Sequence, residues 1–295
     1  MYILKRWINI ENLNWDNLSR NPNAIDLLKE NPDKINWNYL SENPNAIPLL
    51  EANIDKIRWP MLSHNPNSIP ILEANQDKIG WPDLIDNPNA VHLLEKNFHK
   101  NFCREFISAN TGAIEFLEKN SYIINWAILS SNRNAIHLLE ANQDKIDWFY
   151  LSKNPNAIHL LEKNQHKLDR FCWLVLSNNP NAIPILEANP DKIDWRCLSS
   201  NPNAIPILEA NPDKIDWPSL SRNPNAIHLL EANPDKIYWE NFSKNPAIFD
   251  VLDCEALKQR CLIYSEELIQ KTMHPSRIQK YLDMGISIDE LDNCI

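Results

Sequence analysis

The sequence predicts an all-α solenoid, in which one short unit is copied along the chain and the copies stack on one another. Tryptophan recurs every 22 residues over most of the chain, and the intervals share the string Asn-Pro-Asn-Ala-Ile or a close variant. Such self-similarity is typical of repeat proteins, so we expect an elongated array of about ten helix-turn-helix units with a cap at each end. The evenly spaced tryptophans are Trp15, Trp37, Trp59 and Trp81, then Trp126 and Trp148, then Trp173, Trp195, Trp217 and Trp239.

The first helix of each unit follows the Asn-Pro-Asn turn. A representative copy runs from Asn201 to Arg222, and we number its residues as repeat positions 1 to 22. Apolar side chains at positions 4, 5 and 8 have the spacing of a buried helical face. Asn203, at position 3, is the expected N-cap, and Asn211 the expected end. Proline at position 6, such as Pro206, fits only the first helical turn, where its missing N–H had no partner.

The second helix is expected to start at position 16, usually Asp or Asn, and to run through the tryptophan to a Leu-Ser pair. In the representative copy these residues are Asp216, Trp217, Leu220 and Ser221. Helices this short do not persist alone, so neighbouring units must bury Ile, Leu and Trp together. Tryptophans in successive layers are too far apart for direct ring stacking, so each is expected to fill its own groove between repeats.

A leucine-rich-repeat-like α/β solenoid is the alternative fold, because 22 residues also fit its period and Leu-Ser-x-Asn resembles part of its motif. The parallel strand of that fold needs apolar residues two apart. The residue two before the leucine is instead Asp16, Asn38, Pro60, Pro82 or Arg196. Proline in an inner strand removes a ladder hydrogen bond. The pattern therefore favours helical pairs and leaves the strand-bearing fold as the alternative.

The repeat pattern divides the chain into three parts. Residues 1–14 precede it and are expected to form an N-terminal cap, residues 15–245 the repeat solenoid, and residues 246–295 a helical C-terminal cap. The pattern is irregular near 98–125, where a cysteine replaces a tryptophan, and near 165–175, where three residues are inserted. An irregular unit can present a surface that the regular units lack.

Composition argues against several classes of protein. A net charge of −10 repels phosphate backbones, so nucleic acid is an unlikely partner. No segment approaches the roughly 18 apolar residues of a membrane helix, and the first residues lack the apolar core of a signal peptide. The glycines Gly80, Gly112 and Gly285 lie too far apart to form a phosphate-binding loop. The six cysteines have no paired spacing, and we expect reduced thiols in a soluble, cytoplasmic protein.

The periodic polar residues argue against catalysis and metal binding. Equivalent atoms in successive helical layers lie about 8 to 10 Å apart, too far for two histidines at position 6 to share one zinc. Serine at position 21 also recurs in nearly every unit, whereas a catalytic nucleophile is a single group with a converging base. We therefore predict no enzyme activity, no metal and no cofactor. The Asp-Lys pair at positions 13 and 14 is expected to be a solvated turn, with the lysine reaching a glutamate at position 9. The histidines are His92, His137, His159 and His228.

Residues that contact a partner are expected at the variable positions 6, 18, 19 and 22 and in the irregular units. Aromatic and arginine side chains are the usual anchors of protein interfaces. This criterion selects Tyr39, Phe149, Tyr150 and Arg196 from the regular units, and Arg104, Arg170 and Phe171 from the irregular ones.

The string Asn-Pro-Asn-Ala-Ile-His-Leu-Leu-Glu-Ala-Asn at 223–233 resembles the short repeats of proteins from giant DNA viruses, and the resemblance covers about residues 15–250. The unit also loosely resembles a shortened ankyrin repeat without its hairpin finger. Trp-Pro-x-Leu-Ser-x-Asn corresponds to the first ankyrin helix, and Ala-Ile-x-Leu-Leu-Glu-Ala-Asn to the second. The resemblance implies a viral repeat protein that acts in the host cytoplasm, and it carries no known chemistry.

Together these observations predict a non-catalytic, monomeric scaffold for protein–protein interaction, with an unidentified protein as its partner. Two alternatives stay open. One is a single-stranded RNA-binding array that reads one base per layer. The other is a substrate-recruiting adaptor of a ubiquitin ligase, which would act through the C-terminal tail at 246–295.

Overall fold

The computed structural model describes residues 1–98, 104–253, 255, 257–259, 261–262, 264, 270–271 and 274–283. It contains two compact units. The larger comprises Tyr2–Asp250, and the smaller comprises the chain from Val251 onward together with Met1. The larger unit is an array of short helix pairs with a period of about 22 residues, so the predicted helical repeat fold is confirmed. The smaller unit includes helix α22 (Pro275–Asp283).

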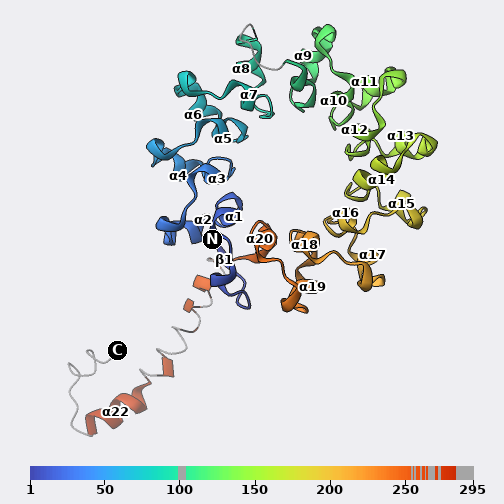
Figure 1. Ribbon diagram of the computed structural model, residues 1–295. Coiled ribbons are helices and arrows are strands. Elements are labelled where there is room, and N and C mark those ends of the chain that lie inside the picture. Colours follow the sequence, from blue (N-terminus) through green and yellow to red (C-terminus); the bar gives the residue numbers. More distant parts are fainter. Residues whose placement is uncertain are drawn as a thin grey trace. The chain divides into compact units, whose positions relative to one another are not determined.

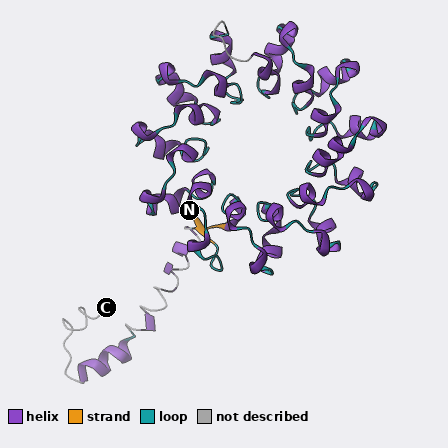
Figure 2. Cartoon of the chain, viewed as in Figure 1, coloured by secondary structure: helices purple, strands orange, loops and turns teal. Residues whose placement is uncertain are grey.

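Each repeat contributes one helix to an inner layer and one to an outer layer (Figures 1 and 2). The inner helices are α1 (Trp15–Arg20), α3 (Trp37–Leu40), α5 (Trp59–His64), α7 (Trp81–Leu84), α10 (Trp126–Ser130), α12 (Trp148–Ser152), α14 (Arg170–Ser177), α16 (Trp195–Ser199), α18 (Trp217–Leu220) and α20 (Trp239–Phe242). The outer helices are α2 (Ile25–Glu30), α4 (Ile47–Glu51), α6 (Ile69–Ala74), α8 (Val91–Lys96), α9 (Ile114–Lys119), α11 (Ile136–Ala141), α13 (Ile158–Lys163), α15 (Ile183–Glu187), α17 (Ile205–Ala210) and α19 (Ile227–Glu231).

Short 3-10 helices connect these layers. In the irregular repeat, η5 (Arg104–Ala109) takes the place of an inner helix. The others are η1 (Ile10–Asn12), η2 (Pro32–Lys34), η3 (Ile54–Lys56), η4 (Gln76–Lys78), η6 (Ser121–Ile123), η7 (Gln143–Lys145), η8 (Gln165–Lys167), η9 (Pro190–Lys192), η10 (Pro212–Lys214), η11 (Pro224–Ala226), η12 (Pro234–Lys236) and η13 (Pro246–Ile248).

The inner helices begin where the sequence predicts. The carboxylate of Asp216 accepts a hydrogen bond from the Ser219 backbone N–H at 2.9 Å, which satisfies one of the free donors at the start of α18. Position 16 is therefore the N-cap. The same side-chain cap is made by Asn14, Asn36, Asn125, Asp147, Asp169 and Asp194.

The outer helices begin one residue later than predicted. Ala204, and not Asn203, is the N-cap of α17, and it makes no side-chain cap hydrogen bond. The amide group of Asn203 donates instead to the Pro180 carbonyl of the preceding repeat at 2.9 Å. Asn203 is thus used between repeats and is not available as a cap. Pro206 lies in the first turn, as expected.

An asparagine at position 1 joins each repeat to the one before it. The fully buried amide of Asn201 donates to the carbonyls of Ser177 and Asn179, at 3.1 and 2.9 Å, and its side-chain oxygen accepts from the Asn203 backbone N–H. The carboxamide thereby fixes its own turn and binds the preceding one. In the described residues, eleven asparagines repeat this pattern: Asn21, Asn43, Asn65, Asn87, Asn110, Asn132, Asn154, Asn179, Asn201, Asn223 and Asn245.

Position 21 adds a second bond between repeats. The buried Ser199 hydroxyl donates to the Trp195 carbonyl at 2.7 Å and accepts from the Asp216 backbone N–H of the next repeat at 2.9 Å. The leucines at positions 8 and 20, such as Leu208 and Leu220, have no exposed surface and form the core between the two layers. The recurrent serine is thus structural, as its periodicity predicts.

The last repeat lies against the first, so the larger unit closes into a ring (Figure 1). The Asn21 amide donates to the carbonyls of Ser243 and Asn245 at 3.1 and 3.0 Å, and the Asn23 amide to the Pro246 carbonyl at 2.9 Å. The position-1 asparagine makes the same two bonds at the internal interfaces, and most position-3 asparagines make the third. The expectation of an elongated array is therefore wrong, because a small rotation per repeat accumulates until the two ends meet.

The segments expected to cap two free ends instead take part in this closure. Strand β1 (Tyr2–Leu4) pairs with β2 (Phe249–Val251) in a two-stranded sheet. These are the only strands in the described part of the chain, and the repeats themselves contain none, which rules out the leucine-rich-repeat-like alternative. Most of residues 254–295 lie outside the described residues, so a capping role for that tail stays a prediction.

Candidate interaction surface

Tyr39 lies half-buried on α3 and already has an intramolecular partner. The Arg20 guanidinium lies over its ring, 3.9 Å from the centroid. Nε of Arg20 lies 3.1 Å from a carboxylate oxygen of Glu42. This places a cation on one face of the aromatic ring. Only the remaining part of Tyr39 is open to a partner.

Phe149 and Tyr150 form a second local cluster on α12. Their rings meet edge to face with centroids 5.6 Å apart, and both side chains are half-buried. The Lys153 ammonium lies 4.6 Å from the Phe149 centroid and 4.9 Å from that of Tyr150. These predicted contact residues therefore lie together, but in a different repeat from Tyr39.

The predicted arginines fall in separate repeats. Arg196 is exposed on α16, and Arg104 begins η5, with its side chain outside the described residues. Arg170 and its neighbour Phe171 are both exposed on α14. The predicted residues thus form two local pairs, Phe149 with Tyr150 and Arg170 with Phe171, and the others lie in separate repeats.

The inserted residues at 170–172 lengthen α14 by almost one turn. Asp169 caps this helix by accepting from the Cys172 N–H at 2.8 Å, and α14 has eight residues where the other inner helices have four to six. Because a helical turn has about 3.6 residues, three extra residues leave Trp173 facing the core as its counterparts do. Trp173 is only 7% exposed, and Ser177 still bonds its carbonyl at 2.9 Å. The insertion therefore leaves the tryptophan in the core and its bond with the serine intact.

The extended helix exposes an apolar face that the regular repeats lack. Phe171 is 64% exposed and Leu174, three residues further, is 38% exposed on the same side of the helix. Arg170 flanks them. Sequence reasoning selected Arg170 and Phe171 but missed Leu174. Its place at position 18, directly after the tryptophan in an irregular unit, was the available signal.

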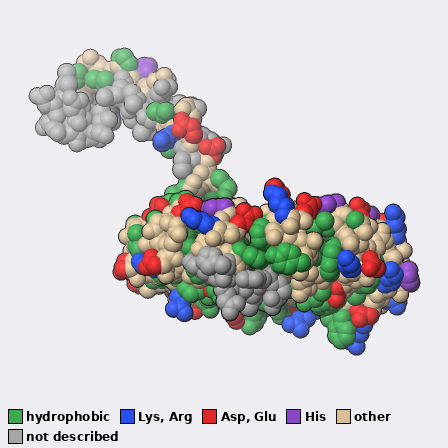
Figure 3. Space-filling view, turned by 90° about the horizontal axis from the view of Figure 1, so that it is seen from above, with side chains coloured by type: hydrophobic (Ala, Val, Ile, Leu, Met, Phe, Trp, Pro, Cys, Tyr) green, Lys and Arg blue, Asp and Glu red, His purple; other side chains and the backbone are tan. Residues whose placement is uncertain are grey.

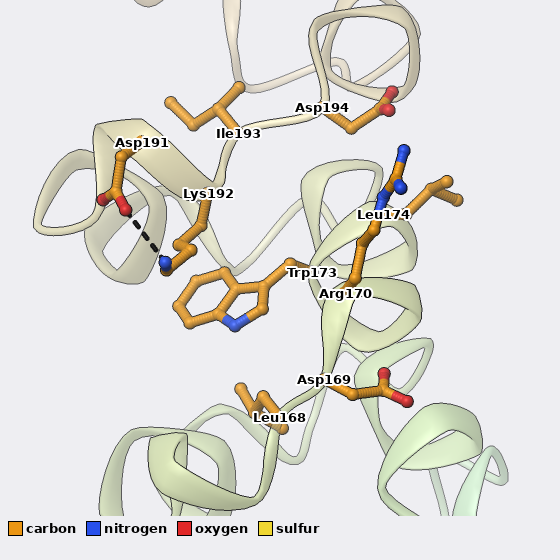
Figure 4. Close-up of a pocket in the computed structure, with 9 residues that line it drawn as sticks. All are labelled: Leu168, Asp169, Arg170, Trp173, Leu174, Asp191, Lys192, Ile193 and Asp194. Atoms are coloured by element: carbon orange, nitrogen blue, oxygen red, sulfur yellow. Dashed lines mark ion pairs between the residues drawn. The ribbon is translucent and has the colours of Figure 1, made fainter.

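A cavity of about 480 Å³ adjoins this helix (Figure 4). It lies between α14 and the loop of the next repeat, where Asp191 and Lys192 form an ion pair of 2.9 Å. Its wall combines apolar, acidic and basic side chains. The lining residues are Leu168, Asp169, Arg170, Trp173, Leu174, Asp191, Lys192, Ile193 and Asp194.

Next to the cavity, Lys192 makes a different contact from the lysines at the same repeat position elsewhere. The position-14 lysine was expected to reach a glutamate. In the regular repeats it lies over the tryptophan of the preceding repeat, at 4.5 to 4.8 Å from the ring, because this exposed aromatic face attracts a cation. Lys192 pairs with Asp191 instead. The lysines over tryptophans are Lys34, Lys56, Lys78, Lys145, Lys167, Lys214 and Lys236.

Two thiols near the cavity are poor nucleophiles. Burial raises the pKa of the Cys172 thiol, and the Asp169 carboxylate adds to this effect. Burial, and then the nearby Asp194 carboxylate, raise the pKa of Cys197 to about 11. Since the thiolate is the reactive form of cysteine, both groups stay protonated and inert at neutral pH.

The histidines at position 6 lie on the surface and each meets a glutamate of the preceding repeat. Nε2 of His92 lies 2.9 Å from Glu73, and that of His137 lies 2.7 Å from Glu118. His159 and His228 repeat this pairing. Within the ranges that the structure describes, no three His, Cys, Asp or Glu side chains are grouped as a metal would require. The absence of a metal, cofactor or enzyme activity stays a prediction.

The surface carries charges of both signs. Figure 3 shows acidic and basic side chains interspersed over the visible face of the repeats, with no large area of one sign. None of the described helices has the length and apolar character needed to cross a membrane. The face in this view thus offers no extended basic track of the kind that binds a phosphate backbone.

Comparison of the chain with protein-family models, with curated proteins and with solved structures gave no match. The functional argument therefore depends on the residues of this chain alone. Among the described surfaces, the face of α14 with its adjoining cavity is the one that combines exposed apolar side chains, an arginine and a concave wall.

Proposed function

We propose that this chain is a non-catalytic scaffold that binds a protein partner through the exposed face of α14. The main observation in support is that Phe171 and Leu174 are exposed beside the cavity. The exposed part of these side chains is not covered by a neighbouring repeat. An aromatic residue flanked by arginine is typical of the few residues that dominate binding energy at protein interfaces.

The mixed wall of the cavity favours a peptide segment over a small apolar ligand. Asp169, Asp191 and Asp194 alternate with Arg170 and Lys192 around Trp173. A partner that fits this wall presents an apolar side chain next to polar groups of both signs, because buried charges left without partners oppose binding. Following the resemblance to viral repeats, we propose that this partner is a host cytoplasmic protein.

The proposal is tested by comparing proteins retained by the wild-type chain and by the double variant Phe171→Ala/Leu174→Ala in quantitative affinity capture. We expect at least one protein to bind directly and to lose about tenfold or more in affinity, as for the anchor residues of other interfaces. Direct binding is then measured by calorimetry with the purified partner.

Tyr122→Ala is the matched control, because Tyr122 is 82% exposed but lies on η6, outside the cavity. We expect this variant to keep the partner. Circular dichroism and thermal unfolding establish that all variants are folded. If every captured protein binds the double variant as tightly as the wild type, α14 is not the interface.

A further inference from the structure

One interface of the ring differs from all the others in connectivity. We call it the seam; it is formed by Asn14–Asn23 of the first repeat and Glu240–Pro246 of the last. Every other neighbouring pair of repeats is consecutive in the chain, whereas the two sides of the seam are more than 200 residues apart in sequence, as in Asn17 with Glu240 (223 residues). The seam is therefore held by non-covalent contacts alone.

The hydrogen bonds of the seam copy those of an internal interface. Asn21 bonds the carbonyls of Ser243 and Asn245 as Asn201 bonds those of two earlier residues. The Ser243 hydroxyl accepts from the Asn14 backbone N–H at 2.8 Å, as the position-21 serines Ser177 and Ser199 accept from the next repeat. In the local geometry of these bonds, the first repeat is simply the next repeat after the last.

Additional contacts come from the residues before the first helix. We call residues 2–13 the latch. Strand β1 pairs with β2, and the Lys5 ammonium forms an ion pair with Asp250. The Trp7 ring lies 5.8 Å from that of Phe242, which is completely buried. In the described residues no internal interface contains a strand pair, so the latch adds a contact that takes the place of the missing covalent connection.

The two sides of the seam are complementary to each other and not to themselves. The first repeat supplies donors, the side-chain amides of Asn21 and Asn23 and the backbone N–H of Asn14. The last repeat supplies acceptors, including the carbonyls of Asn245 and Pro246. An interface between two different surfaces is heterologous, so it can close within one chain or connect one chain to the next.

We propose that the ring opens at the seam, that the latch keeps it closed, and that an opened end binds the complementary end of a second copy of this chain. An opened ring leaves the buried donors of the first repeat and the acceptors of the last repeat without partners. Only a surface with the same repeat geometry satisfies both, and the chain itself provides it. Closure within one chain is favoured while the effective concentration of its own end exceeds that of other chains.

The test mixes Lys5→Glu with Asp250→Lys and follows the mixture by light scattering after size exclusion, over a wide range of protein concentration. Each variant alone has like charges at its own seam. A seam between the two chains instead pairs opposite charges at both closures of a two-chain ring. We expect the mixture to form dimers whose fraction rises with concentration, and each variant alone to form fewer.

The double variant Lys5→Glu/Asp250→Lys is the control, because it restores an opposite pair within one chain. We expect it to stay monomeric at the same concentrations, as the wild type does. The proposal is overturned if the mixture remains monomeric at every concentration. Equal association of either variant alone overturns it too, since general destabilisation is then the cause.

Discussion

The repeat that contains α14 and the one that contains α16 share most of a buried framework and differ mainly in what they expose. Each has a position-1 asparagine that donates to carbonyls of the preceding repeat and a position-21 serine that accepts from a backbone N–H of the next. The α16 repeat covers its tryptophan with Lys214, while the α14 repeat exposes Phe171 next to a cavity. Fold and recognition are therefore encoded by different positions of the repeat, and they are separable by mutation.

The largest effect is expected in the shared core. Leu176→Ala and Leu198→Ala remove completely buried side chains at the same repeat position of α14 and α16. We expect each to lower the free energy of unfolding by about 3 kcal/mol. Urea unfolding followed by circular dichroism measures both. A clear difference between the two values would show that the insertion has altered the core.

The asparagine bonds are expected to have the next largest effect. Asn154→Ala and Asn179→Ala each leave two buried carbonyls without their donor. We expect a loss of about 2 kcal/mol in the free energy of unfolding for each variant. Similar values at the start of the inserted repeat (Asn154) and of the regular repeat that follows it (Asn179) support a uniform framework. A negligible loss in the second would mean that the bonds of Asn179 are not important for stability.

Deletion of residues 170–172 tests directly whether the insertion causes the difference between the α14 and α16 repeats. It leaves Asp169 directly before Trp173, which is the order found at Asp194 and Trp195. We expect a folded protein, destabilised less than by either leucine substitution, in which Lys192 moves over the Trp173 ring. A crystal structure of the variant checks the position of Lys192. The same deletion is expected to abolish partner capture, since it removes Phe171.

The cap of α14 predicts a pH dependence. Hydrogen bonds from the Cys172 backbone lower the pKa of Asp169 below its ordinary value, so this carboxylate stabilises the fold fully above that ordinary value. The contribution is lost as the pH falls through the lower pKa of the folded state. Asp169→Asn keeps a capping oxygen that does not titrate. We expect it to weaken the pH dependence of the melting temperature in this acidic range, and an unchanged profile would contradict the assignment.

The smallest effect is expected at the lysines that cover tryptophans. Lys214→Ala removes the ammonium 4.5 Å from the Trp195 ring, on an exposed surface, and is expected to cost about 0.5 kcal/mol. Lys192→Ala removes a lysine that is paired with Asp191 and is expected to cost less. Thermal unfolding in parallel measures both. Equal losses would remove this distinction between the two repeats.

Much of the repeat was predictable from the sequence, because its signals are local. The cap at Asp216 and the helix start at Trp217 follow from residue type and spacing alone. The cap assigned to Asn203 was wrong because the amide of that residue has a partner, the Pro180 carbonyl, 23 residues away. A sequence pattern shows which residues recur, but it does not show which repeat each side chain bonds to.

Ring closure could not be predicted from local sequence signals either. It depends on the sum of small rotations over many repeats, and no single residue determines that sum. The residues that form the seam can be recognised in the sequence only once the ring is known. Asn21 carries the position-1 asparagine in the first repeat, although no earlier repeat in the sequence offers it a partner. The face of α14 was found in part, because the insertion is visible as a break in the period.

The asparagine bonds have a consequence for the topology of the chain. Each carboxamide donates backwards, from one repeat to the preceding one, and Asn21 continues this sense into the last repeat. In these bonds the ring has a direction but no beginning, and it is the latch that distinguishes the seam from the other interfaces. Circular permutation that joins the present ends of Tyr2–Asp250 and reopens the chain at any regular Asn-Pro-Asn turn is expected to preserve the same cycle.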